Sequence, residues 1–212
     1  MLGCTGSYTP PSSTESSPPA IYLHGWVTSR FFKIPQSRLA QEHEDEWPGH
    51  PVCVAATHMD GLVLALTPFN SSCNYRSAVV HGWANIVTDP KEREYALELI
   101  TNNILTDQWR YSRVPPSEAE LKSTGVLRVE IVSASAKVRA STVGNDRSDL
   151  TNEQVVGKVW TGVVPSWITY GEPIPGAENQ VAAAPSYIRD WIQKQNREGE
   201  EYARRVAVQA KK

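Results

Sequence analysis

The sequence predicts a mainly β protein of the α+β kind, an antiparallel barrel with helices packed outside. Three observations support this fold class. The 212 residues suffice for one domain with a sizeable core, segments of strand pattern outnumber helical ones, and neighbouring strand segments are joined by short turns. A doubly wound parallel sheet fits this order of elements poorly, because there strands and helices alternate.

Six runs of the chain have the composition of strands. The first stops at Gly25, where a turn begins. Asp60-Gly61 stands between two β-rich runs and is a strong hairpin signal. Gly82 is expected to mark a bulge in the following strand. The strand-like runs are residues 21–25, two runs within 52–69, then 75–88, 125–141 and 158–170.

The clearest helix follows Asp89. This aspartate can cap the helix, Pro90 suits its first position, and Glu92 completes a capping box. A second capping box, running from Ser117 to Glu120, predicts a short helix. Both helices therefore have start signals that are local in the sequence.

Two further helices are predicted near the ends of the chain. One runs from Ser29 to about Gln41 and must be interrupted or restarted at Pro35. The other begins at about Ser186, and its charged end beyond Arg197 is expected to fray. These elements predict a main domain over residues 1–178 and a helical tail over residues 179–212.

Composition excludes several functional classes. The net charge of −2 and the pI near 6.2 argue against a general nucleic-acid binder, which would be basic. No apolar run approaches the roughly 20 residues needed to cross a membrane, and residues 1–19 lack the features of a secretory signal. Cys4, Cys53 and Cys73 are sparse and have no CxxC spacing, which indicates reduced thiols and a cytoplasmic location.

Common catalytic motifs are absent from the sequence. It has no HExxH, GxSxG, Walker or GxGxxG pattern. The acidic loop HEDEWPGH, residues 43–50, is expected to be solvated and to bind no metal, because its carboxylates have no second ligand cluster. The sequence therefore predicts no metal site.

Two clusters place hydroxyl groups beside an arginine, as a phosphate requires. In the first, His24-Gly25 is followed by Ser29 and Arg30 at the expected start of a helix. The alternative is purely local: Ser29 caps the helix and Arg30 covers an apolar face. The second cluster begins a long strand and consists of Asn74, Tyr75, Arg76 and Ser77.

Several stretches together carry a family resemblance. They are YLHG…SR (22–30), DGLVLA (60–65), NYRSAVVHGWANIVTDPKER (74–93), SAKVR (135–139) and VWTGVVP (159–165). In this order they resemble the flavin-binding split-barrel family of pyridoxamine 5'-phosphate oxidase-like proteins, and most closely the nitroimidazole-resistance-type branch. The resemblance implies a six-stranded split barrel, a homodimer, and FMN bound at the dimer interface.

The resemblance also implies site residues. Ser29 and Arg30 match the family's Ser-Arg-Lys turn that holds the flavin phosphate, although position 31 is Phe rather than Lys. His24 and Gly25 match the strand end beside that phosphate. The other positions implied to contact the cofactor are Asn74, Tyr75, Arg76, Ser77, Lys137 and Trp160; Lys137 and Arg139 fit a structural role equally well.

The chain departs from the family pattern in two places. Asn70-Ser71 stands where the pattern has two histidines, and neither residue can deliver a proton near neutral pH. The chain also begins where the family's N-terminal helix and hairpin would normally have ended. Ring-side contacts to the flavin are therefore expected to be altered more than phosphate-side contacts.

Three functions follow from these expectations. The first is an FMN-dependent oxidoreductase acting on a small organic molecule. The second is a non-catalytic protein that holds FMN or another phosphorylated ligand. The third is a cofactor-free isomerase or cyclase that uses the barrel cavity.

Overall fold

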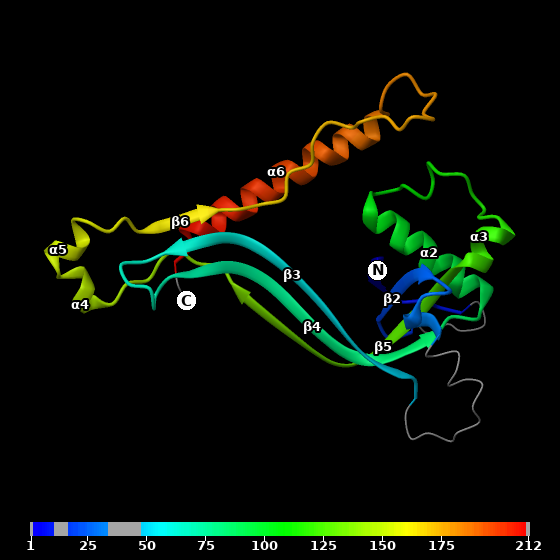
Figure 1. The fold of residues 1–212 in the computed structure, drawn as a ribbon, viewed down its shortest axis with the longest axis horizontal. Helices are drawn as coiled ribbons and strands as arrows, with labels where there is room; N and C mark the ends of the chain where they lie inside the picture. The colour runs from blue at the N-terminus through cyan, green and yellow to red at the C-terminus, as the bar shows by residue number, and fades with distance from the viewer. Residues whose placement is uncertain (1, 11–16, 34–47, 211–212) are drawn as a thin grey trace. The chain divides into compact units, whose positions relative to one another are not determined.

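The computed structural model describes residues 2–10, 17–33 and 48–210. In this part of the chain six strands form one antiparallel sheet in the order β1-β2-β5-β4-β3-β6 (Figure 1). The predicted mainly β, six-stranded antiparallel fold is confirmed. The strands are β1 (Leu2–Gly6), β2 (Ala20–Trp26), β3 (His50–Leu64), β4 (Ser72–Ile86), β5 (Thr124–Arg139) and β6 (Gly162–Pro165). The helices are α2 (Pro90–Ile104), α3 (Glu118–Ser123), α4 (Arg147–Leu150), α5 (Glu153–Val156) and α6 (Ser186–Val208).

The chain forms two compact units. The first unit comprises Met1–Val54 and Val79–Ser135, and the second unit comprises Ala55–Ala78 and Ala136–Lys212. Strands β3, β4 and β5 each contribute residues to both units. The first unit also holds β1, β2, α2 and α3, while the second holds β6 and the remaining helices.

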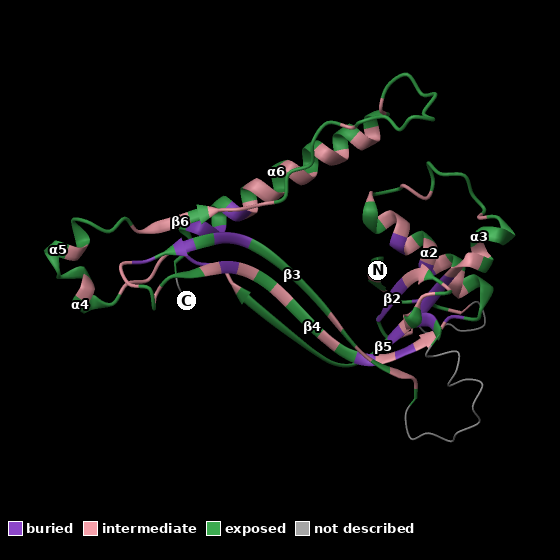
Figure 2. Ribbon diagram, viewed as in Figure 1, coloured by how far each residue is buried: buried purple, intermediate pink, exposed green. Residues whose placement is uncertain are grey.

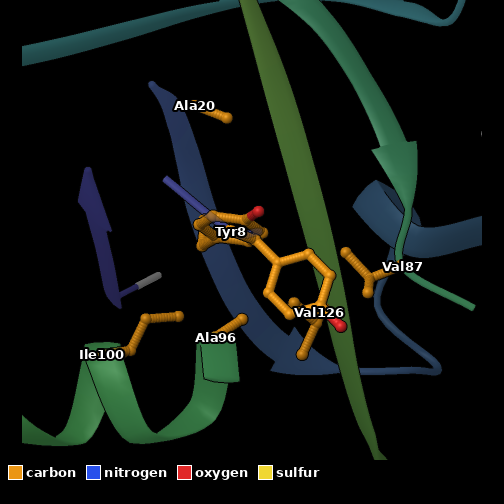
Figure 3. Close-up of a cluster of buried hydrophobic side chains, with 7 residues drawn as sticks. Tyr8, Ala20, Val87, Ala96, Ile100 and Val126 are labelled. Atoms are coloured by element: carbon orange, nitrogen blue, oxygen red, sulfur yellow. The ribbon is translucent and has the colours of Figure 1, made fainter. Parts of the chain in front are cut away.

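Strand β2 is the centre of the first unit. It pairs antiparallel with β1 on one edge and with β5 on the other. Its alternate side chains enter two separate hydrophobic clusters, as the two-residue period of a strand requires. Ala20 and Tyr22 pack with Tyr8, Ala96 and neighbours from α2 and β5 (Figure 3). The opposite cluster contains Ile21, Leu23, Phe32, Ala84, Leu127 and Val129.

Helix α2 begins as predicted, but not through a capping box. The side chain of Asp89 accepts a hydrogen bond from Lys91 N, and Pro90 occupies the first turn. Glu92 does not fold back onto the cap. Its carboxylate instead accepts a 2.8 Å hydrogen bond from the buried Tyr22 hydroxyl and lies 3.8 Å from Arg128. The predicted box at Asp89 is therefore wrong, because tertiary partners from the sheet occupy Glu92.

The capping box of α3 is confirmed. The Ser117 side chain accepts from Glu120 N, and Ser117 N donates to Glu120 Oε2 at 2.6 Å. Arg113 donates to both carboxylate oxygens of Glu120. The hydrogen bonds from Arg113, and secondly those from Ser117, lower the pKa of Glu120 from 4.5 to about 2.

This lowered pKa predicts how the stability of the α3 start depends on pH. A carboxyl group with a depressed pKa stabilises the fold above its ordinary value of 4.5, and this contribution disappears as the pH falls towards about 2. In Glu120→Gln the amide can still cap the helix but carries no charge. We expect the wild type to melt higher than this variant at pH 6, and the difference to shrink steadily below pH 4.5.

Glu118→Gln is the matched control for this measurement. Glu118 lies on the same helical turn, is 91% exposed, and pairs with Lys122 at 3.8 Å. Its substitution should leave the pH profile of the melting temperature almost unchanged. If the wild type melted as far above Glu120→Gln at pH 2 as at pH 6, the charge of Glu120 could not be the cause of the difference in stability.

The predicted hairpin at Asp60-Gly61 is wrong. β3 is one continuous strand of 15 residues that passes through both positions. The glycine is needed because β6 lies very close: a Cβ at Gly61 would lie 2.8 Å from Val164 O. Gly61 pairs with Pro165 in this antiparallel ladder. The Asp60-Gly61 pair, which resembles a turn in the sequence, therefore marks a close approach of two strands.

Gly82 has a comparable role in the first unit. β4 runs without interruption from Ser72 to Ile86, so the residue lies inside a regular strand. A Cβ at Gly82 would lie 2.1 Å from the carbonyl oxygen of Glu130. The expected bulge is not needed to explain this glycine, since the backbone of β5 occupies the space of any side chain.

Two predicted elements have different lengths. The strand predicted over 158–170 is reduced to β6, Gly162–Pro165, whose last residue has no N–H to continue the ladder. The tail helix does not fray after Arg197, because α6 continues to Val208 and packs on β6. Ala203, Val206 and Ala207 are buried near its end and fix it.

No helix in the described ranges is long and apolar enough to span a membrane. Of the helix predicted from Ser29 to about Gln41, the structure describes only a helical turn from Arg30 to Lys33. The remainder, which includes Pro35, lies outside the described residues, as does most of the acidic loop predicted over 43–50.

Candidate functional site

The turn that follows β2 is held in place by packing in the first unit. Phe32 is 1% exposed and lies against the glycine of β5: a Cβ at Gly125 would meet the Phe32 ring at 2.5 Å. Val27 N donates to Ser123 O at 3.1 Å, and Ser29 N donates to Trp26 O at 2.9 Å. The Ser29–Arg30 segment is therefore anchored at both ends.

Ser29 carries the most informative atom of this turn. Its backbone carbonyl accepts from Phe32 N and Lys33 N, which makes it the start of the helical turn. Its side-chain oxygen is buried but has no hydrogen-bond partner, so it does not cap the helix. A buried hydroxyl without a partner costs about 1–3 kcal/mol, and a ligand that accepts its hydrogen bond would recover this energy.

Arg30 is the next residue along the chain and is exposed. Within the described part of the chain it has no ion-pair partner, so its guanidinium is available to an anion. An arginine can give a phosphate two parallel charge-assisted hydrogen bonds. The unpartnered Ser29 hydroxyl and this cation together match the donor set that a phosphate monoester requires.

His24 and Gly25 lie at the end of β2 that leads into this turn. Gly25 pairs with Gly125 of β5, and His24 pairs with Val126. His24 also lines a cavity of about 320 Å³ with Leu97, Trp109 and other side chains of the first unit. Burial lowers the pKa of His24 from its ordinary value of 6.5. The imidazole is thus neutral at pH 7, so it can form hydrogen bonds but adds no positive charge.

The second predicted cluster lies in the second unit, at the start of β4. Asn74 is fully buried, and both ends of its amide are hydrogen-bonded: it donates to Ser141 O at 3.0 Å and accepts from Arg139 and Ser141 N at 2.9 and 3.2 Å. These contacts tie the end of β5 to β4. Tyr75, the next residue, is half-buried.

Arg76 already has an anionic partner. Its guanidinium donates to both oxygens of Asp60, at 3.0 and 2.8 Å, and lies 4.1 Å from the centroid of the Tyr202 ring. The hydrogen bonds with Asp60 raise the pKa of Arg76. Because the carboxylate is buried and bidentate, the positive charge of Arg76 is compensated before any ligand binds.

The remaining predicted site residues also belong to the second unit. The Ser77 hydroxyl donates to Lys137 O at 3.2 Å, while Lys137 itself is exposed. Trp160 precedes β6 and is 65% exposed, and its ring covers Gly162, where a Cβ would meet it at 2.5 Å. The structure thus groups His24, Gly25, Ser29 and Arg30 in one unit and the other six predicted residues in the other. Their contacts with a cofactor stay predictions.

The sequence reasoning missed two residues of the second unit. Asp60 was interpreted as a turn residue, although a carboxylate inside a β-rich run needs a partner and so signals a buried ion pair. His58 lies on the same strand, with its Nδ1 3.7 Å from Asp60 Oδ1. Among the residues that the structure describes, no group of three metal-ligating side chains is found.

Asn70 and Ser71 have structural partners. Asn70 donates to Asp146 Oδ2 at 3.2 Å, and the Ser71 hydroxyl donates to Thr67 O and accepts from Ala65 N. Both residues thus hold the connection between β3 and β4. The departure from the two histidines of the family pattern is accommodated by these local contacts.

Residues 18–138, more than half of the chain, match the family described as pyridoxamine 5'-phosphate oxidase. The chain belongs to this family. The matched segment contains β2, the Ser29–Arg30 turn and nearly all of β5. The resemblance to this family inferred from the sequence motifs is thereby confirmed. A search of curated protein sequences found no match.

Solved structures similar to this member of the family include two that match over most of the chain. The flavocytochrome Anf3 from Azotobacter vinelandii is 25% identical, with a TM-score of 0.66 over 90% of this chain and 84% of that one. The FAD and heme binding protein from Mycobacterium smegmatis is 23% identical, with a TM-score of 0.66 over 90% and 89%. A putative 5-nitroimidazole antibiotic resistance protein from Bacteroides thetaiotaomicron is 18% identical, with a TM-score of 0.38 over 55% and 60%.

Proposed function

We propose that this protein binds FMN and acts as a flavin-dependent oxidoreductase on a small organic molecule. The observation that carries the proposal is the buried, unpartnered Ser29 hydroxyl beside the exposed Arg30. Both residues lie in the segment that matches the pyridoxamine 5'-phosphate oxidase family. A cytoplasmic location, suggested by the free thiols of Cys4, Cys53 and Cys73, is part of the proposal.

The residues of the turn fit the phosphate end of the cofactor. Ser29 would donate through its hydroxyl and Arg30 through two N–H groups, while the packing of Phe32 fixes their positions. The neutral His24 would lie along the same strand end without adding charge. Bound FMN supplies hydride or electron transfer, and the protein supplies binding and orientation.

A titration with three flavins tests this proposal. We expect the purified protein to bind FMN much more tightly than riboflavin, since only FMN carries the phosphate monoester that Ser29 and Arg30 would hold. FAD is the third ligand, because the similar protein from Mycobacterium smegmatis binds FAD. Equal affinity for FMN and riboflavin would contradict the phosphate site. Bleaching of the bound flavin by NADH or NADPH, reversed by a candidate substrate, tests the oxidoreductase activity.

We also propose that the protein is a homodimer. Residues 130–138 of β5 are all exposed, although successive side chains of a strand point to opposite faces (Figure 2). Neither face is therefore covered along this stretch, and within the first unit Ile131 and Val132 are 38% and 64% exposed. Uncovered apolar strand surface is a site for association, and a symmetric pair of chains would cover it in both copies.

Light scattering checks the dimer and its surface. We expect a mass of twice 23.5 kDa at micromolar concentration. Val132→Glu places a charge in the proposed interface and should shift the equilibrium towards the monomer. Ile104→Glu is the control, because Ile104 is 51% exposed at the end of α2 and lies outside this stretch. A monomeric wild type would refute the proposal.

A further inference from the structure

The second unit contains a cavity that does not include the Ser29–Arg30 turn, although Arg76 is one of its lining residues. Its volume is about 310 Å³, and its walls come from β3, β4, the segment after β6 and one face of α6. This volume is at the lower end of the range of small-molecule pockets, about 300–1,000 Å³. Its aromatic walls are Tyr170 and Tyr202, and its polar groups include His58, Gln195 and Glu198.

The two tyrosines of this cavity are held by contacts with neighbouring residues. Tyr170 N donates to Asn196 Oδ1 at 2.8 Å, and Tyr170 O accepts from Asn196 Nδ2 at 2.8 Å. The Tyr170 ring also packs edge-on against Trp191, with 4.8 Å between centroids. The Tyr202 ring lies 4.1 Å from the guanidinium of Arg76, which also lines the cavity, and 5.2 Å from that of Arg205. The two tyrosine side chains are thus preset for a flat ligand.

The charges of the residues that line the cavity favour a cation over an anion. The positive charge of Arg76 is compensated by Asp60, which also lies near His58. Glu198 is the carboxylate among the lining residues, and its partner Lys194 is 4.0 Å away in an exposed pair on α6. Exposed pairs of this kind contribute little. The lining therefore presents a carboxylate oxygen to a cation, but no uncompensated arginine or lysine to an anion.

Gly199 provides the space for the ligand. It lies on the cavity face of α6, where a Cβ would be 3.5 Å from Trp167 Cβ, an ordinary contact. Alanine therefore fits at this position, while a larger side chain would extend into the cavity. Replacing Gly199 with alanine or with leucine should favour the helix, since glycine is unfavourable in a helix interior.

We propose that this cavity binds a flat ring that is neutral or positively charged, such as a nitrogen heteroaromatic or an aryl amidine. The ring would lie against Tyr170 and Tyr202. A cationic substituent would pair with Glu198, and His58 and Gln195 would form hydrogen bonds at the edge of the ring. This proposal does not depend on the Ser29–Arg30 turn, because the residues that line the cavity all belong to the second unit.

Three ligands of the same shape test the proposal: benzamidine, benzamide and benzoate. Binding to the full-length protein at pH 8 is measured by ligand-observed NMR, in the millimolar range that ligands of so few atoms reach. We expect benzamidine to bind about three- to fivefold more tightly than benzamide, as a half-exposed ion pair allows, and benzoate not to bind. Preferential binding of benzoate would overturn the proposal.

Variants place the binding in this cavity. Glu198→Gln should reduce benzamidine to the affinity of benzamide, whereas Glu201→Gln should change nothing, because Glu201 pairs with Arg197 and does not line the cavity. Gly199→Leu should abolish binding of both ligands, and Gly199→Ala should largely preserve it. Circular dichroism confirms that the helix is retained. Unchanged benzamidine binding in Gly199→Leu would refute the site.

An excess of FMN separates this proposal from the flavin site. We expect FMN to leave benzamidine binding unaffected, whether or not FMN itself binds. Competition between FMN and benzamidine would show that the cavity belongs to the flavin and would overturn the inference. Failure of FMN to bind, with benzamidine binding intact, would contradict the proposed function and leave the cavity proposal standing.

Discussion

Replacing Arg30 with alanine will weaken FMN binding by about two powers of ten or more. The expected loss is two charge-assisted hydrogen bonds to the phosphate, each worth roughly 1.5–3 kcal/mol. Riboflavin has no phosphate, so its affinity should be the same in wild type and variant. The melting temperature should hardly change, because Arg30 is exposed and has no ion-pair partner among the described residues. Fluorescence titration of both flavins measures these differences.

Two further variants make this result specific. Lys33→Ala removes another exposed cation from the same helical turn. If the Arg30 guanidinium contacts the phosphate directly, Lys33→Ala should weaken FMN binding much less than Arg30→Ala does. Ser29→Ala should weaken FMN binding by about one hydrogen bond, roughly 1 kcal/mol. It should not lower the stability of the fold, because the Ser29 hydroxyl does not cap the helix. A lower melting temperature for Ser29→Ala would instead support the capping role.

Arg76→Met is expected to destabilise the second unit by about 3 kcal/mol. The substitution leaves the Asp60 carboxylate, whose side chain is 4% exposed, without the two hydrogen bonds that compensate its charge. Breaking a buried ion pair from one side costs about 3–5 kcal/mol. The lower end applies here, because the Arg76 side chain is 44% exposed. Urea denaturation at pH 7 measures the change in the free energy of unfolding.

A double variant distinguishes the ion pair from simple loss of packing. In Asp60→Asn with Arg76→Met no charge remains buried, so the protein should be more stable than Arg76→Met alone. Arg76→Lys keeps a positive charge but loses the bidentate geometry, and its stability should lie between wild type and Arg76→Met. A double variant less stable than Arg76→Met would show that the pair matters through its shape rather than its charge.

The sequence predicted the elements whose signals are local. Helix α3 begins at Ser117 because its capping box is complete within four residues. Helix α2 begins after Asp89 because this side chain caps the helix and Pro90 follows it. The fold class followed from the number and spacing of strand-like runs. Asp60-Gly61 was misinterpreted as a turn because the partners that explain these two residues lie elsewhere in the chain: β6 approaches Gly61, and Arg76 pairs with Asp60. A local pattern cannot distinguish this arrangement from a turn.

The candidate site was predicted only in part. The spacing of Ser29 and Arg30 after Gly25 indicated a phosphate turn, and the anchoring by Phe32 explains how that turn is held. That the Ser29 hydroxyl has no partner depends on which atoms pack around it, which no motif encodes. The cavity beside α6 was missed because its residues come from segments more than 130 positions apart, from His58 to Glu198.

The position of β2 between two clusters also has a consequence for the dynamics of the first unit. Ala20 to Leu23 are buried on both faces, and the strand is bordered by β1 and β5. The β2 amides that pair with β5 are therefore shielded from water, and they exchange with solvent only when the surrounding layers separate. The slowest amide exchange in the first unit should thus be found in β2, at the free energy of opening the whole unit.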